Sequence, residues 1–303
     1  MAVPPAPSRL LDKISEAAER LARGMEEGVY RSGRIALEQR GGVLVGVGGL
    51  ERGFVVVGDL HGDTRSLETI LASTGDLPLV LLGDYVDRAP PEDQALLLEA
   101  VLDQYLEGRG AVVLRGNHEP PRGLEPYPHD YPYALAQLYG REKGLEIYRA
   151  SRRLFELLPY ALVMPGLAIM LHGGPPTTSR GSNIVEYLGG PGYPPPQDIL
   201  EEILWNDPSE TVRDRAPSPR GAGSLWGETV TLRALRLAGD GRLIIRGHEP
   251  VLTGYKWNHG ERVLTLFSKL GAPYHAHQGA YLLCGAPWDL RDAGGCIRTY
   301  TLP

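Results

Sequence analysis

Five short apolar runs along the chain each end directly in a cluster of Asp, His, Asn or Arg residues. Short apolar runs bounded by Gly, Pro or charge are typical of buried strands. Because loops at strand ends are where rigid folds place ligands and catalysts, we expect these clusters to form one site. The clusters are GDLHGD at 58–63, GDYVDR at 83–88, RGNHE at 115–119, HGG at 172–174 and RGHE at 246–249.

The first half of the chain alternates strand-like and helix-like patterns, whereas the second half holds mostly strand-like runs. Apolar residues recur at helical spacing over 10–22, 92–108 and 142–159. This alternation predicts an α/β fold with helices on the outside of its sheets.

We expect one domain, residues 1–303, with an N-terminal helical segment at about 8–40. Two stretches rich in Pro, Gly and Ser, at 173–197 and 207–224, predict surface loops rather than linkers.

Charge and composition exclude several classes of function. The net charge of −6, from 31 Lys and Arg against 37 Asp and Glu, argues against broad binding to nucleic acid or anionic membranes. No apolar run is long enough to span a bilayer and no secretory signal pattern opens the chain, so we expect a cytoplasmic protein. Cys284 and Cys296 are too few for a zinc site of the four-Cys kind or for a disulfide framework.

The five clusters offer imidazole, carboxylate and amide groups but no thiolate. Such ligands suit Mn, Fe, Zn or Ni rather than copper or an iron–sulfur cluster. We expect two divalent ions, with Asp84 as the bridging carboxylate and a shared water as the nucleophile. Asp59 and His61, two residues apart on an extended segment, hold the first ion. The second ion is then completed by Asn117, His172 and His248.

His118 directly follows a predicted ligand, so its side chain should point away from that of Asn117. We therefore predict that His118 is a general acid that binds no metal. A nearby carboxylate would orient its ring and favour its charged form, and Asp87 is the candidate. Arg88 beside Asp87 offers bidentate hydrogen bonds to phosphate oxygens.

These residues resemble the PPP family of metal-dependent serine/threonine phosphatases, within the wider calcineurin-like metallophosphoesterases. The wider group is marked by Asp-x-His, Gly-Asp-x-x-Asp and Gly-Asn-His-Glu, and the fuller forms GDLHG, GDYVDR and RGNHE are similar to PPP sequences. The resemblance covers about residues 50–285. Later segments look like family blocks in the expected order: HGG at 172–174, LWNDP at 204–208, PRG at 219–221, WG at 226–227 and RGH at 246–248.

The resemblance implies a central β-sandwich flanked by helices, the four-layer α/β/β/α metallophosphoesterase fold, with a two-metal site at one edge of the sandwich. It implies two divalent ions, with Mn expected first and Fe, Zn, Ni or Co as alternatives. The metal ligands that it implies are Asp59, His61, Asp84, Asn117, His172 and His248.

The resemblance also implies a His118–Asp87 acid pair and phosphate-binding roles for Arg88 and Arg220. Asn117 and Tyr274 are expected beside the substrate. The sequence departs from the usual family pattern at three places. These are Ala89 in place of Gly, Asn206 in place of Ser, and Ala272-Pro273-Tyr274 in place of Ala-Pro-Asn-Tyr.

We therefore expect a phosphatase that hydrolyses phosphoserine and phosphothreonine in proteins by direct attack of a metal-bridging hydroxide, with phosphorylated proteins as its partners. One alternative uses the same site on a small phosphoanhydride such as diadenosine tetraphosphate. Another is a module that kept the fold, lost catalysis and binds phosphopeptides. The sequence identifies no regulatory subunit.

Residues outside the clusters are expected to be structural. His129, His259, His275 and His277 are predicted to be surface or structural residues. Asp207, which precedes Pro208, is predicted to lie in a turn or to support the ligands.

Overall fold

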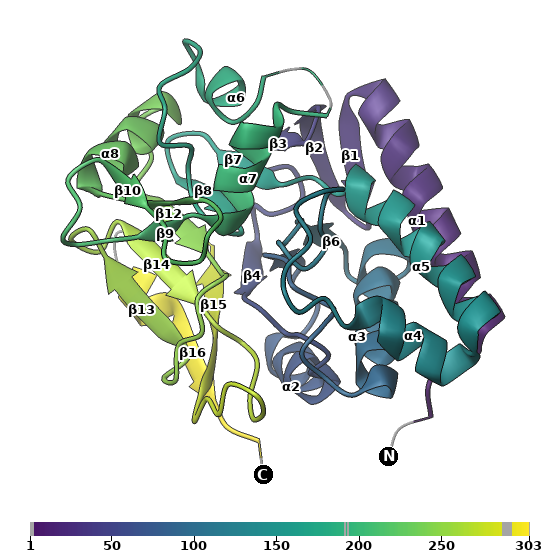
Figure 1. Ribbon diagram of the computed structural model, residues 1–303. Helices are drawn as coiled ribbons and strands as arrows, with labels where there is room; N and C mark the ends of the chain where they lie inside the picture. Colours follow the sequence, from purple (N-terminus) through teal and green to yellow (C-terminus); the bar gives the residue numbers. More distant parts are fainter. Residues whose placement is uncertain (1–2, 191, 193, 287–292, 303) are drawn as a thin grey trace.

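Two large β-sheets form the centre of the fold in the computed structural model, which describes residues 3–190, 192, 194–286 and 293–302 (Figure 1). The eight-stranded sheet has the order β1-β2-β3-β7-β8-β12-β14-β13, and the five-stranded sheet has the order β16-β15-β4-β5-β6. A small third sheet has the order β10-β11-β9. The first sheet comprises β1 Val29–Ser32, β2 Ile35–Arg40, β3 Val43–Val45, β7 Ala161–Met164, β8 Ala168–Leu171, β12 Leu243–Arg246, β13 Tyr255–Asn258 and β14 Val263–Leu266. The five-stranded sheet comprises β4 Gly53–Val57, β5 Leu79–Leu81, β6 Ala111–Val113, β15 Gly279–Gly285 and β16 Ile297–Tyr300. The small sheet comprises β9 Asp207–Pro208, β10 Arg215–Pro217 and β11 Ser224–Trp226.

Helices cover both large sheets. Figure 1 shows α1, α3, α4 and α5 gathered at the right of the molecule and α8 at the left. The helices are α1 Pro7–Glu27, α2 Thr64–Thr74, α3 Pro91–Leu106, α4 Tyr131–Tyr139, α5 Arg141–Leu157, α6 Ile184–Tyr187, α7 Gln197–Trp205, α8 Glu228–Leu237 and α9 Ala293–Cys296. None of these helices is long and apolar enough to cross a membrane.

Alternating side chains on the strands build two hydrophobic clusters, one on each face of the eight-stranded sheet. On β7, Leu162 and Met164 join a cluster shared with α1, α3, α5 and the five-stranded sheet, whereas Ala161 and Val163 join a cluster shared with α6, α7 and α8. Because successive side chains on a strand point to opposite faces, the two faces of β7 pack against different layers of the fold. The predicted α/β fold, with its sheets flanked by helices, is therefore confirmed.

The N-terminal segment differs from its prediction. Helix α1 buries Leu10, Ile14 and Leu21 as the spacing predicts, but it ends at Glu27 because Gly28 adopts a left-handed φ of 70°. Residues 29–40 are not helical. They form the β1–β2 hairpin, whose second strand alternates buried and exposed side chains, and this period of two overrides the expected helical segment at 8–40.

The predicted loops at 173–197 and 207–224 also contain short elements. The first holds α6, and the second holds β9, β10 and the start of β11. These elements are too short to leave an apolar pattern of their own, which is why composition alone predicted only loops there.

Leu10→Ala is expected to lower the free energy of unfolding by about 2–5 kcal/mol, because Leu10 is fully buried between α1 and its neighbours. Leu11→Ala is the matched control, since the adjacent Leu11 is only partly buried and should cost much less. Urea titrations followed by circular dichroism measure both. Equal losses for the two variants would contradict the packing of this helix.

Candidate active site

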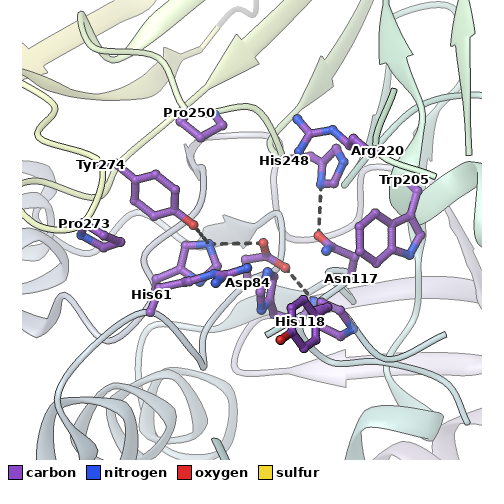
Figure 2. A pocket seen from close by; sticks show the side chains of 13 residues that line it. His61, Asp84, Asn117, His118, Trp205, Arg220, His248, Pro250, Pro273 and Tyr274 are labelled. Carbon is purple, nitrogen blue, oxygen red and sulfur yellow. Dashed lines mark hydrogen bonds and ion pairs between the residues drawn. The ribbon is translucent and has the colours of Figure 1, made fainter. Parts of the chain in front are cut away.

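The five polar clusters come together where strands of both large sheets end. Strands β4, β5 and β6 are parallel neighbours, and β8 and β12 are parallel neighbours in the other sheet. Their carboxyl ends therefore carry Asp59, Asp84 and Asn117 from one sheet and His172 and His248 from the other to a common place, which Figure 2 shows in part.

Asp84 lies at the centre of this site. Its Oδ2 is 3.3 Å from His61 Nε2, and its Oδ1 is 3.3 Å from His172 Nε2. Two groups of potential metal ligands share this one carboxylate: His61, Asp84 and His118, and Asp59, Asp84 and His172. This arrangement is the one that a bridging carboxylate needs. The groups differ from the predicted ligand sets in two ways: the first includes His118, which was predicted to bind no metal, and the second places Asp59 beside His172, although Asp59 was predicted to share an ion with His61.

The tautomers of two predicted ligands are set by backbone carbonyls. Nδ1 of His61 donates to the carbonyl of Val86 at 2.9 Å, and Nδ1 of His172 donates to the carbonyl of Leu82 at 3.0 Å. In the neutral rings each Nε2 is then a lone-pair acceptor that faces a carboxylate oxygen. A proton or a metal ion must lie between two such acceptors. Burial lowers the pKa of His172, but Asp84 and Asp59 outweigh it and raise that pKa to about 9.

The remaining predicted ligands also fit divalent cations. Oδ1 of Asn117 is 2.8 Å from His172 Nε2 and 2.9 Å from His248 Nδ1. Oδ2 of Asp59 is buried and has no hydrogen-bond partner, so it offers a free lone pair. Nδ1 of His248 faces the other ligand atoms, and its Nε2 lies 4.0 Å from Asp207 Oδ1. Burial also holds the pKa of His248 well below its ordinary value, which keeps the imidazole neutral as a ligand. All these donors are nitrogen or oxygen, which suits Mn, Fe or Zn.

Two glycines leave room for the ligands. A Cβ at Gly116 would lie 2.2 Å from Asp84 Oδ1, and a Cβ at Gly247 would lie 2.3 Å from Asp59 Oδ1. Any other residue at these positions would displace a predicted ligand.

Glu119 fixes two of the site loops to each other. Its buried carboxylate accepts the backbone N–H groups of Asp84 and Tyr85 at 2.8 Å and that of Gly116 at 3.0 Å. Burial and the nearby charge of Asp84 raise the pKa of Glu119 to about 7. The RGNHE cluster contains this residue, but no role could be predicted for it, because its partners are backbone groups that leave no pattern in the sequence.

Several site residues have strained backbone. His61, Asp84, Asp87, Arg88 and His248 all have positive φ, between 41° and 72°. Such values are uncommon for residues with a side chain and persist only where surrounding contacts enforce them. Their concentration here marks these loops as functional.

The predicted acid pair is formed. Nδ1 of His118 donates to Asp87 Oδ2 at 2.6 Å. Asp87 Oδ1 accepts the backbone N–H groups of Asp130 and Tyr131, at the start of α4, at 2.9 and 2.7 Å. Burial opposes ionisation of Asp87, but hydrogen bonds from two histidines outweigh it and hold the pKa of Asp87 well below its ordinary value.

The second of those histidines is His129, which the sequence did not connect with the site. Its Nδ1 donates to the same Asp87 Oδ2 at 2.7 Å. Because the two residues lie 42 positions apart in unrelated segments, no spacing could have indicated the contact. His275 and His277 are exposed and His259 is buried away from the pocket, as expected of surface or structural residues.

Most of the predicted site residues line one cavity of about 550 Å³, namely His61, Asp84, Arg88, Asn117, His118, Arg220, His248 and Tyr274. Asp59, Asp87 and His172 lie behind its wall, in contact with residues that line it. Tyr274 Oη is 3.3 Å from His61 Nε2 (Figure 2). Further lining residues are Pro126, Tyr127, Trp205, Pro250 and Pro273.

Asp207 supports Arg220. Nε of Arg220 donates to Asp207 Oδ2 at 2.6 Å, and Nη2 of the buried Arg246 donates to Asp207 Oδ1 at 3.0 Å. Burial opposes ionisation of Asp207, but Arg246, His248 and Arg220 lower its pKa to about 2. At neutral pH Asp207 is therefore ionised, and it holds the Arg220 guanidinium group at the cavity wall.

Comparison with known proteins agrees with this geometry. The family model for calcineurin-like phosphoesterases matches residues 53–252, which contain the five clusters. The chain belongs to this family. It is thus a metal-binding hydrolase of phosphate esters, a metallophosphoesterase.

Solved structures show the same fold in other phosphatases. This phosphoesterase is similar to a structure from Saccharomyces cerevisiae described as a protein serine/threonine phosphatase with similarity to human phosphatase PP5, at 20% identity and a TM-score of 0.72, covering 99% of this chain and 91% of the other. It is also similar to a cold-active protein tyrosine phosphatase, at 16% identity and a TM-score of 0.54, covering 85% and 80%. A cold-active protein-tyrosine phosphatase of a psychrophilic Shewanella species matches at 16% identity and a TM-score of 0.51, covering 86% and 82%.

Asp84→Asn is expected to reduce bound metal to fewer than two ions per chain, because Asp84 faces both groups of ligands. Metal content is measured by inductively coupled plasma mass spectrometry after loading with Mn²⁺ and desalting. Asp76→Asn, at an exposed position outside the site, is the control and should bind as much metal as the unmodified protein. Retention of two ions and full activity by Asp84→Asn would remove Asp84 from the bridging role.

Proposed function

We propose that this phosphoesterase hydrolyses phosphoserine and phosphothreonine monoesters in proteins, in one step and without a phosphoenzyme. One observation carries the proposal: a single cavity is lined by Asp84 with several of the predicted ligands around it, by His118, whose Nδ1 is hydrogen-bonded to Asp87, and by Arg88 and Arg220. These are the groups that transfer of a phosphoryl group to water requires.

Asp59, His61 and Asp84 would hold one divalent cation, and Asp84, Asn117, His172 and His248 a second, with Mn as the first candidate. Bound there, the cations supply Lewis-acid charge for the phosphoryl oxygens and a nucleophilic water at neutral pH.

Arg88 and Arg220 bind the phosphate. Both side chains line the cavity. Asp207 fixes the direction of the Arg220 guanidinium group by accepting a hydrogen bond from its Nε. A guanidinium group donates paired hydrogen bonds that match phosphate oxygens and stabilises the charge that they carry in the transition state. Asn117 and Tyr274, which also line the cavity, contact the bound ester.

His118 protonates the leaving oxygen. Its Nδ1 is occupied by Asp87, so its Nε2 is the atom that carries the transferable proton into the cavity. Because Asp87 stays ionised, it stabilises the imidazolium form that the transfer needs.

Two observations support a protein substrate. The solved structures that resemble this chain are a protein serine/threonine phosphatase and a protein tyrosine phosphatase. The cavity is bordered by Tyr127, which is 97% exposed, and by Pro250 and Pro273, so its mouth offers apolar surface to a chain on either side of a phosphorylated residue.

His118→Asn is expected to lower turnover of a phosphoserine peptide by roughly 10²–10⁴ and that of p-nitrophenyl phosphate much less, because nitrophenolate leaves without protonation. Steady-state kcat on both substrates measures the difference. The exposed His277→Asn serves as control and should leave both rates unchanged. Equal losses on the two substrates would refute the acid role of His118.

The substrate class is tested with protein stripped by a chelator and resupplied with Mn²⁺. Phosphate release should return on phosphoserine and phosphothreonine peptides and exceed that on a phosphotyrosine peptide and on diadenosine tetraphosphate. Selective cleavage of the dinucleotide would keep the site but overturn the protein substrate. Phosphopeptide binding with no turnover under any metal would indicate the silent binding module instead.

A further inference from the structure

Two imidazole rings donate to one carboxylate oxygen beside the cavity. Nδ1 of His118 and Nδ1 of His129 lie 2.6 and 2.7 Å from Asp87 Oδ2. An ionised carboxylate only accepts hydrogen bonds, so both Nδ1 atoms carry hydrogen. The tautomers of both neutral rings are therefore set by the same oxygen atom.

The second nitrogens of the two rings have different surroundings. His118 lines the cavity, whereas His129 does not. Nε2 of His129 is instead 3.1 Å from the hydroxyl of Tyr148, on α5, and the His129 side chain is 9% exposed. In the neutral ring this nitrogen accepts the phenolic hydrogen. His129 is thus held from both ends and does not reach the substrate.

Asp87 is held in a strained conformation by groups from several segments. Its φ of 64° lies in the left-handed region, which residues with a side chain rarely adopt and which persists only where contacts enforce it. Its backbone N–H donates to Gln94 Oε1, backbone N–H groups of Asp130 and Tyr131 donate to Oδ1, and His129 is the second side chain, besides His118, that donates to Oδ2.

We propose that His129 is a positioning residue for the acid pair: it holds Asp87 Oδ2 against the ring of His118. The inference rests on the proposed function, because it takes His118 as the general acid. His129 also belongs to the 120–130 loop, whose Pro126 and Tyr127 line the cavity, so the same contact ties that loop to the acid pair.

The test compares two phosphate esters that differ in leaving group, phenyl phosphate and p-nitrophenyl phosphate, with the metal-loaded full chain. His129→Ala is expected to lower kcat on phenyl phosphate roughly 10-fold or more and to affect p-nitrophenyl phosphate much less. His129→Asn should restore most of the loss, because its amide nitrogen occupies the place of Nδ1. His129→Gln, which places its amide where Nε2 stood, should not.

Three further variants separate the possible outcomes. If His129 acts through His118, adding His129→Ala to His118→Asn causes no further loss. His259→Asn removes another buried histidine, which contacts Thr231 and Ser209, and should leave the ratio of the two rates unchanged. His118→Asn alone tests the proposed function, since failure to separate the two esters would refute the acid itself.

The inference on His129 fails if His118→Asn separates the two esters but His129→Ala lowers both rates in parallel. It also fails if the double variant loses further activity, or if the Asn variant is no better than the Gln variant. The comparison of Asn with Gln decides the question even if His129→Ala does not fold.

Discussion

Negative charge buried beside negative charge is the constraint on which the rest of this structure depends. Asp59, Asp84 and Glu119 are each at most 2% exposed, and burial and Asp84 raise the pKa of the other two. An ionised carboxylate away from water costs several kcal/mol unless it is paired. The convergence of five strand ends supplies that pairing, with backbone N–H groups around Glu119 and imidazoles around Asp84. Asp59 keeps one oxygen without a hydrogen-bond partner, and a cation bound there would complete the balance.

The anions farther from the centre are neutralised by the protein alone. Asp87 receives two imidazoles and two backbone N–H groups, and Asp207 lies between the guanidinium groups of Arg220 and Arg246. The site therefore has an inner part that fits metal ions and an outer part whose charges are balanced by side chains and backbone N–H groups of the protein. The strained φ values at Asp84, Asp87 and His248 are maintained because so many charged contacts depend on those conformations.

Site residues that follow strands could be predicted from the sequence, whereas contacts made between loops could not. Asp59, Asp84, Asn117, His172 and His248 each follow a buried strand closely, and a strand leaves a visible apolar run, so their meeting could be predicted. His129 and Glu119 bind atoms of distant loops or of the backbone, which leave no periodic pattern. The N-terminal hairpin was missed for a related reason. Polar and apolar residues continue to be mixed after residue 27, and what ends the helix there is the left-handed backbone conformation of Gly28, which the sequence alone does not show. The metal-binding and substrate-binding roles of these residues stay predictions until the variants are measured.

The attachment of the 120–130 loop on both sides of its tip has a consequence for redesign of this scaffold. Glu125 accepts a hydrogen bond from Arg152 at 2.8 Å before the tip, and His129 and Asp130 donate to Asp87 after it, while the tip at Tyr127 is exposed. The tip can therefore be exchanged for longer or differently charged sequences, provided that the graft keeps Glu125 and His129 in place. Such a graft would alter one wall of the cavity, whereas the predicted metal ligands, which follow strands elsewhere in the chain, need no alteration.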